Sequence, residues 1–366
     1  MKLVLIGDGE SPHLVKWARA LEPRLELYAA SSRGFAPALA ELLPPERRLA
    51  LNTRPNFAGG NTAVLRSLPK LGRWLKEIDP AWLHAHYLTS HGTLAVAAKR
   101  GWGLRAKIAG SAWGSDILVT PERSVVLRWL TRRVLRACTL CTSDSLHMAE
   151  RMRALGAREV MSFPFGLETL PPPPGMKQER LFFGNRGLEP IYAPDRVLAA
   201  FSAIVRDWPD AELVLANDGS LRPALEQWVK HSAIADRVRF VGRLSADAQA
   251  QWYTQARWYF SLPRSDSVSV SVLEALAHGC VPILSDLPAN RELVNDGENG
   301  LILGDGRLPD AAELHAMAVR ADRIAHDNHG WVARQAMFEP AVERFVARLH
   351  ALHTGHGLRR PRGSVA

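Results

Sequence analysis

The sequence has few cysteines and no long apolar run. Its three cysteines, Cys138, Cys141 and Cys280, are too few for a disulfide framework, so we expect them to be reduced and buried. No apolar stretch approaches the roughly 20 residues that cross a bilayer. The apolar start of the chain is too short for a signal peptide. These absences predict a cytoplasmic protein.

The first half of the chain is poor in negative charge. Residues 1–170 contain 24 Lys and Arg against 14 Asp and Glu, a net charge of +10, whereas the whole chain carries +9. This balance predicts attraction to polyanions, but no RNA- or DNA-binding motif is present, so we expect no nucleic-acid partner. A hydrophobic content of 47% excludes wholesale disorder, and 366 residues suit two domains better than one.

Strand-like and helix-like runs alternate along most of the chain, which favours parallel sheets built from βαβ units. We expect strands at roughly 2–6, 25–30, 82–86, 107–110, 181–184, 212–216, 238–241, 258–262 and 281–284. Four prolines in a row, 171–174, predict an extended linker between domains. The predicted divisions are a first domain at 1–170, a second at 171–335, a last helix at 336–352 and a disordered tail at 353–366.

Two carboxylates flank the most informative segment of the chain. Asp266 and Glu274 lie eight positions apart, and small and β-branched residues between them lead into a helix. The free N–H groups at a helix start favour an anion such as phosphate. Carboxylates on either side of a phosphate are expected to accept hydrogen bonds from hydroxyl groups, as on a sugar and a ribose. The segment predicts a nucleotide-sugar pocket; the alternative is a strand–helix connection with two solvated acids.

This segment resembles the acid motif of the retaining GT-B glycosyltransferases, specifically their large fourth family. Members carry a Glu, seven residues, and a second Glu followed by Ala, a hydrophobic residue, a small residue and Gly. The run from Glu274 to Gly279 is similar to the second half, and Asp266 stands in place of the first Glu. The resemblance implies that Asp266 contacts the transferred sugar and Glu274 the ribose. It also implies that the backbone of Ser269, Val270 and Ser271 faces the sugar and the diphosphate.

The resemblance implies further donor contacts outside the acid motif. Arg186 matches an Arg that neutralises the diphosphate, but Ile191 occupies the place of the family's Lys, so Arg264 is the candidate for the second charge. Asn217 belongs to a turn that faces the donor in relatives, although ordinary turn chemistry explains it equally well. Gly9 lies in a glycine-containing loop after the first strand, where a plain turn is the alternative.

Four residues of the first domain are implied at the acceptor or sugar site. His13 follows the glycine-containing loop, and Trp113, Gly114 and Asp116 resemble a stretch that relatives write as His-Gly-Ser-Asp. Trp113 replaces that His and offers stacking and one N–H donor, but it cannot exchange a proton. Asp116 has three possible roles, which are orienting its loop, contacting the acceptor and capping the next turn.

The resemblance implies a GT-B architecture, in which two Rossmann-like domains face a cleft and the last helix crosses back to the first. It implies transfer of a sugar from a UDP- or GDP-sugar to a carbohydrate or lipid-linked acceptor, with Asp266, Glu274 and Arg186 as catalytic residues. The expected setting is bacterial surface polysaccharide or glycolipid assembly. We expect no cofactor and no metal, because the sequence contains no Asp-x-Asp. The alternatives are a sugar-nucleotide 2-epimerase and a non-catalytic sugar- or polyanion-binding relative.

A basic amphipathic segment, 123–136, has two interpretations. Four of its arginines alternate with apolar residues, a pattern that is typical of helices lying on an anionic membrane surface. Such a protein would be peripheral at the inner face of the plasma membrane. The plainer interpretation is a helix that packs on its own domain with solvated arginines.

Overall fold

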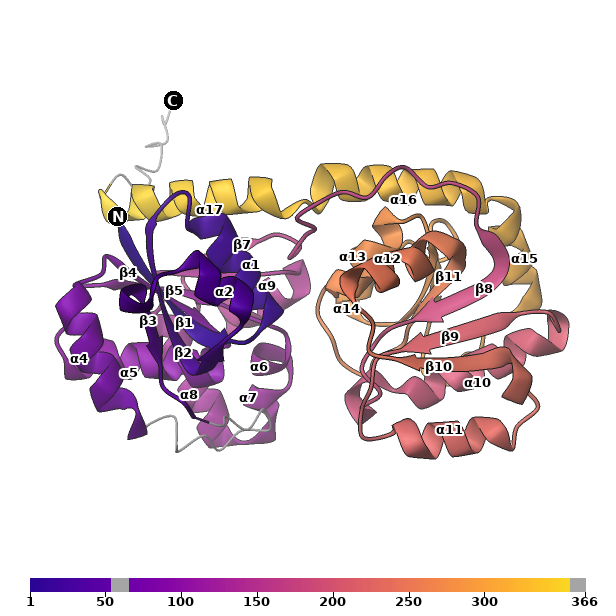
Figure 1. Ribbon diagram of the computed structural model, residues 1–366, viewed down its shortest axis with the longest axis horizontal. Coiled ribbons are helices and arrows are strands. Elements are labelled where there is room, and N and C mark those ends of the chain that lie inside the picture. The colour runs from indigo at the N-terminus through magenta and orange to yellow at the C-terminus, as the bar shows by residue number, and fades with distance from the viewer. Residues whose placement is uncertain (54–65, 356–366) are drawn as a thin grey trace, which may run out of the picture. The chain divides into compact units, whose positions relative to one another are not determined.

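A computed structural model describes residues 1–53 and 66–355 of the chain. It divides into two compact units, each with its own parallel sheet (Figure 1). The first unit comprises Met1–Asp144, Met148–Ser162 and the chain from Glu339 onward. The second unit comprises Ser145–His147 and Phe163–Phe338. Of the predicted disordered tail, 353–366, His353 belongs to the last helix, and the residues from 356 onward lie outside the described residues.

The sheet of the first unit has seven strands in the order β3-β2-β1-β4-β5-β6-β7. These are β1 (Lys2–Gly9), β2 (Glu26–Phe35), β3 (Arg48–Ala50), β4 (Trp82–His86), β5 (Lys107–Ser111), β6 (Leu140–Ser143) and β7 (Val160–Ser162). All the pairings are parallel, so each connection must cross the sheet, and helices form most of these crossings. The central β4 is buried at every position, as a strand covered on both faces must be.

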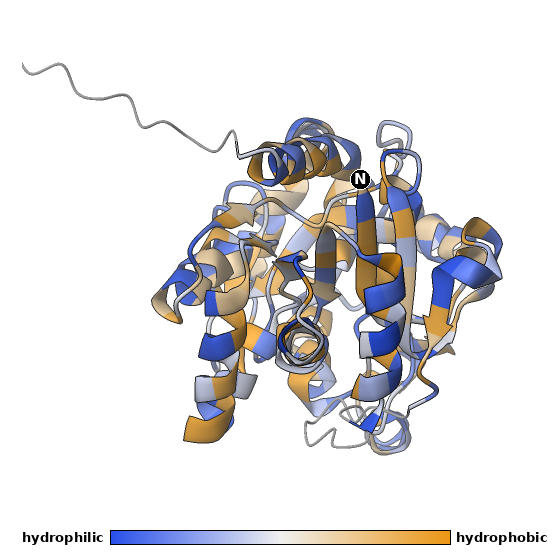
Figure 2. Cartoon of the chain, turned by 90° about the vertical axis from the view of Figure 1, so that its left-hand side faces the viewer, coloured by the Kyte–Doolittle hydropathy of each residue, from blue (hydrophilic) through white to orange (hydrophobic). Residues whose placement is uncertain are grey.

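The helices of the first unit are amphipathic, and Figure 2 shows them banded in orange and blue over the sheet. They are α1 (Pro12–Leu21), α2 (Pro37–Leu42), α4 (Leu68–Ile78), α5 (Thr93–Gly101), α6 (Ser115–Leu118), α7 (Thr120–Arg123), α8 (Val125–Ala137), α9 (Leu146–Ala154) and α17 (Phe338–His353). The described part of the unit also contains a 3-10 turn, η1 (Pro45–Arg47), and a π-helical turn, η2 (Leu88–Gly92). Pro12 and Pro69 each lie in a first helical turn, where the missing N–H breaks no hydrogen bond.

The sheet of the second unit has six parallel strands in the order β10-β9-β8-β11-β12-β13. These are β8 (Gln178–Gly184), β9 (Glu212–Ala216), β10 (Val238–Gly242), β11 (Ala256–Ser261), β12 (Val281–Ser285) and β13 (Leu301–Leu303). Its helices and 3-10 turns are η3 (Pro190–Tyr192), α10 (Pro194–Asp207), α11 (Arg222–Lys230), η4 (Ala235–Arg237), α12 (Ala246–Gln255), α13 (Val270–Ala277), α14 (Pro288–Arg291), α15 (Ala311–Val319) and α16 (Ala321–Gln335).

The chain leaves the first unit ahead of the proline run. From Phe163 onward it packs with the second unit, where the ring centroids of Phe165 and Phe338 are 5.0 Å apart. The N–H of Leu167 donates to the carbonyl oxygen of Ala336 at 2.8 Å. The change of unit therefore falls after Ser162, because buried contacts, and not the stiffness of the prolines, decide which core a segment joins.

The last helix, α17, returns to the first unit, as expected for GT-B. The Phe345 ring is fully buried and lies 5.0 Å from the Trp17 ring, and Arg348 forms two hydrogen bonds with Glu159 at 2.5 and 2.7 Å. The prediction of two Rossmann-like domains with a C-terminal helix that crosses back is thus confirmed. Among the described helices, none combines the length and apolar character needed to cross a membrane.

Candidate active site

The candidate site of the second unit is built on neighbouring strand ends. Arg186 follows the carboxyl end of β8, and the acid segment follows β11 and leads into α13. Because β8 and β11 pair in parallel, their carboxyl ends lie at the same edge of the sheet. Ligands of open α/β sheets bind at this edge.

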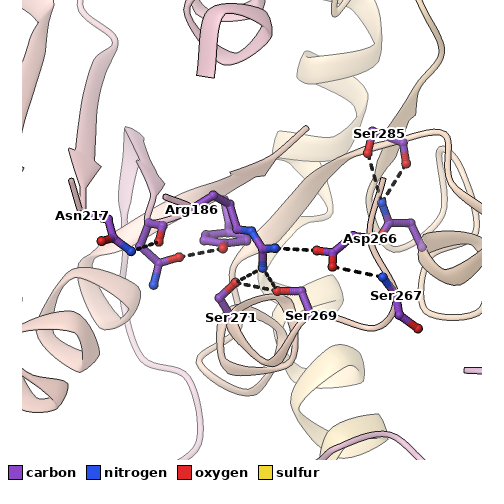
Figure 3. Close-up of polar contacts among 10 residues, drawn as sticks. Arg186, Asn217, Asp266, Ser267, Ser269, Ser271 and Ser285 are labelled. Carbon is purple, nitrogen blue, oxygen red and sulfur yellow. Dashed lines mark hydrogen bonds and ion pairs between the residues drawn. The ribbon is translucent and has the colours of Figure 1, made fainter. Parts of the chain in front are cut away.

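Arg186 is the centre of the predicted donor site. Its guanidinium pairs with Asp266 at 2.5 Å and donates to the hydroxyl of Ser271 at 3.1 Å (Figure 3). It also contacts the Ser269 hydroxyl and lies 4.5 Å from the centroid of the Tyr192 ring. The structure therefore brings together five residues that the sequence separates by up to 85 positions.

Burial and pairing both act on the pKa values of Arg186 and Asp266. Burial lowers the pKa of Arg186, but the Asp266 carboxylate raises it, and its net pKa lies above the usual value. Burial also raises the pKa of Asp266 and outweighs the opposing effects of Arg186 and the Ser267 N–H. Both side chains are mostly covered, with 18% and 22% of their side-chain surface exposed. A cation held this way is positioned before any ligand arrives.

The start of α13 presents unused hydrogen-bond donors. Ser269 occupies the N-cap position, but its hydroxyl forms no cap and contacts Arg186 and Ser271 instead. In the described part of the chain, the N–H groups of Val270 and Ser271 carry no hydrogen bond. Helix starts of this kind bind anions, because the free donors and the helix dipole both favour negative charge.

The buried Tyr253 connects Glu274 to Asn185 and to the backbone of α13 through hydrogen bonds. The Tyr253 hydroxyl lies 3.0 Å from a Glu274 carboxylate oxygen and 3.1 Å from the Ser271 carbonyl, and it accepts from the Asn185 amide at 2.8 Å. The Asn185 side chain also accepts from the Tyr259 hydroxyl at 2.7 Å. Burial raises the pKa of Tyr253 well above its usual range, so this hydroxyl stays protonated and orients the carboxylate.

A cavity of about 270 Å³ lies beside this network, lined by Asn185, Ala216, Asn217, Arg243, Leu244 and Gln249. Asn217 is held in a left-handed conformation (φ 80°), and its amide donates to the Asn185 carbonyl at 3.3 Å. Arg243 is exposed and forms no ion pair within the described residues. The sequence reasoning missed Arg243, although its place directly after β10 was a usable signal, since β10 ends at the same sheet edge.

Arg264 points to a different neighbour from the one expected. Its guanidinium lies 3.4 Å from Asp195, and 62% of the side chain is exposed. Its backbone N–H donates to the Ile191 carbonyl at 2.8 Å, so the loop is tied to the position where relatives carry Lys. Its predicted role at the diphosphate stays a prediction.

Gly9 and His13 occupy the start of the first unit. The Gly9 N–H donates to the Ser31 hydroxyl at 2.8 Å, and an added Cβ would lie 2.6 Å from the Gly34 carbonyl oxygen. Close packing of β1 against β2 therefore explains this glycine by itself. His13 is exposed, and its ring centroid lies 4.4 Å from that of Trp113, so two of the four residues assigned to the acceptor side are in contact.

The buried carboxylate of Asp116 holds its loop in place through hydrogen bonds. Asp116 is fully buried, and its two carboxylate oxygens accept from the backbone N–H groups of Leu88 at 2.8 Å and Trp113 at 2.9 Å. Gly114, which lies between Trp113 and Asp116, has a φ of 94°, a conformation that other residues rarely adopt. This geometry supports the loop-orienting alternative for Asp116.

We expect the stability contribution of Asp116 to depend on pH. Burial raises its pKa to about 6 from 3.8, although the N–H groups of Trp113 and Leu88 lower it. Because the folded pKa is the higher one, protonation favours folding. The resulting stability is present below pH 4 and is lost as the pH rises through 6, by about 3 kcal/mol.

Urea unfolding of the wild type and Asp116→Asn checks this expectation. The variant cannot titrate at this position, so the free energy of unfolding of the wild type minus that of the variant should fall by about 2 kcal/mol from pH 4 to 7. A difference that does not change with pH would contradict the buried, protonatable carboxyl.

A group of buried histidines was also missed by the sequence reasoning. His84 lies 2.7 Å from the Ser111 hydroxyl, and His91 lies 2.9 Å from the Ser32 hydroxyl and 2.8 Å from the His86 carbonyl. Burial lowers the pKa of His84 to about 3 and that of His91 to about 4, so both rings are neutral at physiological pH. Among the described residues, no group of three or more His, Cys, Asp or Glu side chains is placed to hold a metal ion.

Comparison with known families assigns both units. A family model described as "Glycosyl transferase 4-like" matches residues 2–145, and one described as "Glycosyl transferases group 1" matches residues 178–321. Together with the two parallel-sheet units, these matches identify the chain as a glycosyltransferase of the GT-B type.

Individual relatives agree with this assignment. The chain is 26% identical over 285 residues to N-acetyl-alpha-D-glucosaminyl L-malate synthase of Bacillus anthracis, covering 74% of each protein. It is 25% identical over 291 residues to phosphatidyl-myo-inositol mannosyltransferase of Mycolicibacterium smegmatis, covering 75% of this chain and 72% of the relative. A structure of Anabaena HepE in complex with UDP and glucose superposes with a TM-score of 0.77 at 15% identity, covering 96% and 99% of the two chains, which shows the shared fold.

Proposed function

We propose that this enzyme transfers a sugar from a nucleoside diphosphate sugar to an acceptor hydroxyl with retention of anomeric configuration. The observation that carries the proposal is Arg186, held by Asp266 and facing the hydroxyls at the open start of α13. A cation and a helix start on one spot suit a diphosphate, and carboxylates beside them suit sugar hydroxyls. The UDP and glucose bound by HepE, which shares the fold, support a UDP-sugar as the first donor to test.

Each residue of the site has a proposed role. Arg186 and the N–H groups of Val270 and Ser271 bind the diphosphate. Asp266 accepts hydrogen bonds from the transferred sugar, and Glu274, oriented by Tyr253, accepts them from the ribose. We propose Arg243 as an additional donor contact, because it is a cation without an ion pair among the described residues and lines the adjoining cavity.

The proposed reaction breaks the bond between the anomeric carbon and the β-phosphate oxygen. The acceptor oxygen bonds to the same face of that carbon, and its proton passes to the departing phosphate oxygen. Arg186 and the donors of α13 stabilise the charge that develops on the diphosphate, and such preorganised donors are usually the largest catalytic contribution. In this scheme the cation is Arg186 itself, and we propose that no metal takes part.

The acceptor and location are also proposals. We propose a carbohydrate or lipid-linked acceptor bound through the first unit, with His13 and Trp113 as a stacking surface. Sugar rings stack on aromatic faces through their apolar C–H groups, which suits a tryptophan that cannot act as a base. We place the reaction on the cytoplasmic side, in surface polysaccharide or glycolipid assembly.

A short series of measurements tests the donor, the stereochemistry and the absence of a metal requirement. Thermal-shift screening of UDP- and GDP-sugars should identify the donor, since a bound ligand raises apparent stability by mass action. NMR of the product formed from that donor should show that the anomeric configuration of the donor is retained. The rate of sugar transfer should be unchanged in the presence of EDTA. Inverted product would contradict retention, and activity lost in EDTA and restored by manganese would contradict the metal-free scheme. Donor turnover without any acceptor would indicate an epimerase or hydrolase instead.

A further inference from the structure

The outward face of α8 is unusual for a surface helix. Its buried side is formed by Thr131, Val134 and Leu135, which pack on the first unit. The opposite side carries Val125, Val126 and Trp129, which are 81%, 71% and 55% exposed. Three large apolar side chains within five positions are therefore turned to solvent near the start of one helix, where burial would be favourable.

The later turns of the same face carry uncompensated positive charge. Arg132, Arg133 and Arg136 are exposed and form no ion pair among the described residues. Helical spacing of three or four positions places them in line with Val125 and Trp129. The Arg133 guanidinium lies 4.8 Å from the centroid of the Trp129 ring, so the basic and apolar parts are continuous.

Arg128 does not belong to this face. It contacts Glu122 and donates to the Pro121 carbonyl at 3.2 Å, and Glu122 also contacts Arg151. Its charge is therefore compensated inside the unit, unlike the charges of Arg132, Arg133 and Arg136. This contrast separates an arginine that serves the fold from arginines that face a partner.

We propose that this face of α8 docks the enzyme on an anionic membrane surface. Val125, Val126 and Trp129 enter the boundary between headgroups and acyl chains, and the three arginines contact lipid phosphates. Apolar insertion next to a basic row is the arrangement of interfacial helices, and Trp favours the membrane interface. The net charge of +10 on residues 1–170 adds long-range attraction. The proposal does not depend on the donor chemistry proposed above.

Vesicle co-sedimentation tests the proposal. The full chain should bind vesicles of phosphatidylcholine with about one-third phosphatidylglycerol at low salt and leave them at high salt, when the Debye length falls to about 3 Å. Replacing Arg132, Arg133 and Arg136 with Gln should weaken binding on the order of 100-fold, since each basic residue contributes about fivefold. Replacing Val125, Val126 and Trp129 with Ser should weaken it at least about tenfold. If the wild type ignores the anionic vesicles at low salt, the proposal is wrong.

A matched control removes the same charge elsewhere in the first unit. Lys70, Arg73 and Lys76 are exposed on α4, and their replacement with Gln should weaken binding no more than about threefold. Equal losses from the α4 and α8 variants would mean that net charge alone drives binding and would overturn the proposed surface. If the serine variant binds vesicles like the wild type, and heparin competes fully, the face binds soluble polyanions and not a membrane.

Discussion

Replacing Arg186 with Ala should lower turnover by about 100- to 1000-fold, the range observed when one preorganised donor to a developing oxyanion is removed. The guanidinium is held by Asp266 at 2.5 Å and by the Ser271 hydroxyl at 3.1 Å, so it needs no reorganisation to meet a diphosphate. Initial rates with the donor sugar measure the effect. Arg186→Lys keeps the charge but loses the forked donor geometry, and we expect it to recover only part of the rate.

Ligand binding gives this prediction a second readout. Calorimetry should show that Arg186→Ala weakens binding of the nucleoside diphosphate by roughly 10- to 100-fold and leaves the nucleoside almost unchanged, because the lost contact is charge-assisted. Arg239→Ala is a suitable control, because Arg239 is an exposed arginine of β10 that pairs with Glu212 at 2.8 Å. Equal losses for both ligands would mean that Arg186 is structural.

Substitution of the two acids should affect different kinetic parameters. Asp266→Asn should lower turnover by about 100-fold or more with a small change in donor affinity, because Asp266 is assigned to the transferred sugar. Glu274→Gln should weaken donor binding by roughly 10- to 100-fold, since a hydrogen bond to a carboxylate contributes about 1.5–3 kcal/mol. Steady-state kinetics with varied donor separate these effects as changes in kcat and KM.

Two further variants serve as controls for the acid substitutions. Tyr253→Phe removes the hydroxyl that lies 3.0 Å from Glu274 without touching the acid, and it should reproduce part of the Glu274→Gln loss. Glu212→Gln, at an exposed carboxylate of β9, should behave as the wild type. Wild-type turnover in both Asp266→Asn and Glu274→Gln would show that the pocket is misplaced.

Much of the fold follows from patterns that are local in the sequence. The bounds predicted for β4 and β9, 82–86 and 212–216, are those of the structure, because short apolar runs between turn residues specify buried strands directly. Alternation with helices then requires parallel sheets. The acid segment was equally accessible, since loop, helix start and both carboxylates lie within 264–282.

Contacts between distant segments were decided only by the tertiary structure. The pairing of Arg186 with Asp266 spans 80 positions, and the placement of Arg243 beside the cavity depends on three strands ending at one sheet edge. Only the tertiary structure shows that Asp116 is buried and that its carboxylate accepts the backbone N–H groups of Leu88 and Trp113, which favours the loop-orienting alternative. The sequence by itself determined nine of the thirteen described strands and the position of the acid segment, because these depend on neighbouring residues, whereas the short β3, β6, β7 and β13 were not predicted. Which cation meets which carboxylate, and where the chain passes from one unit to the other, depend on packing across the whole fold.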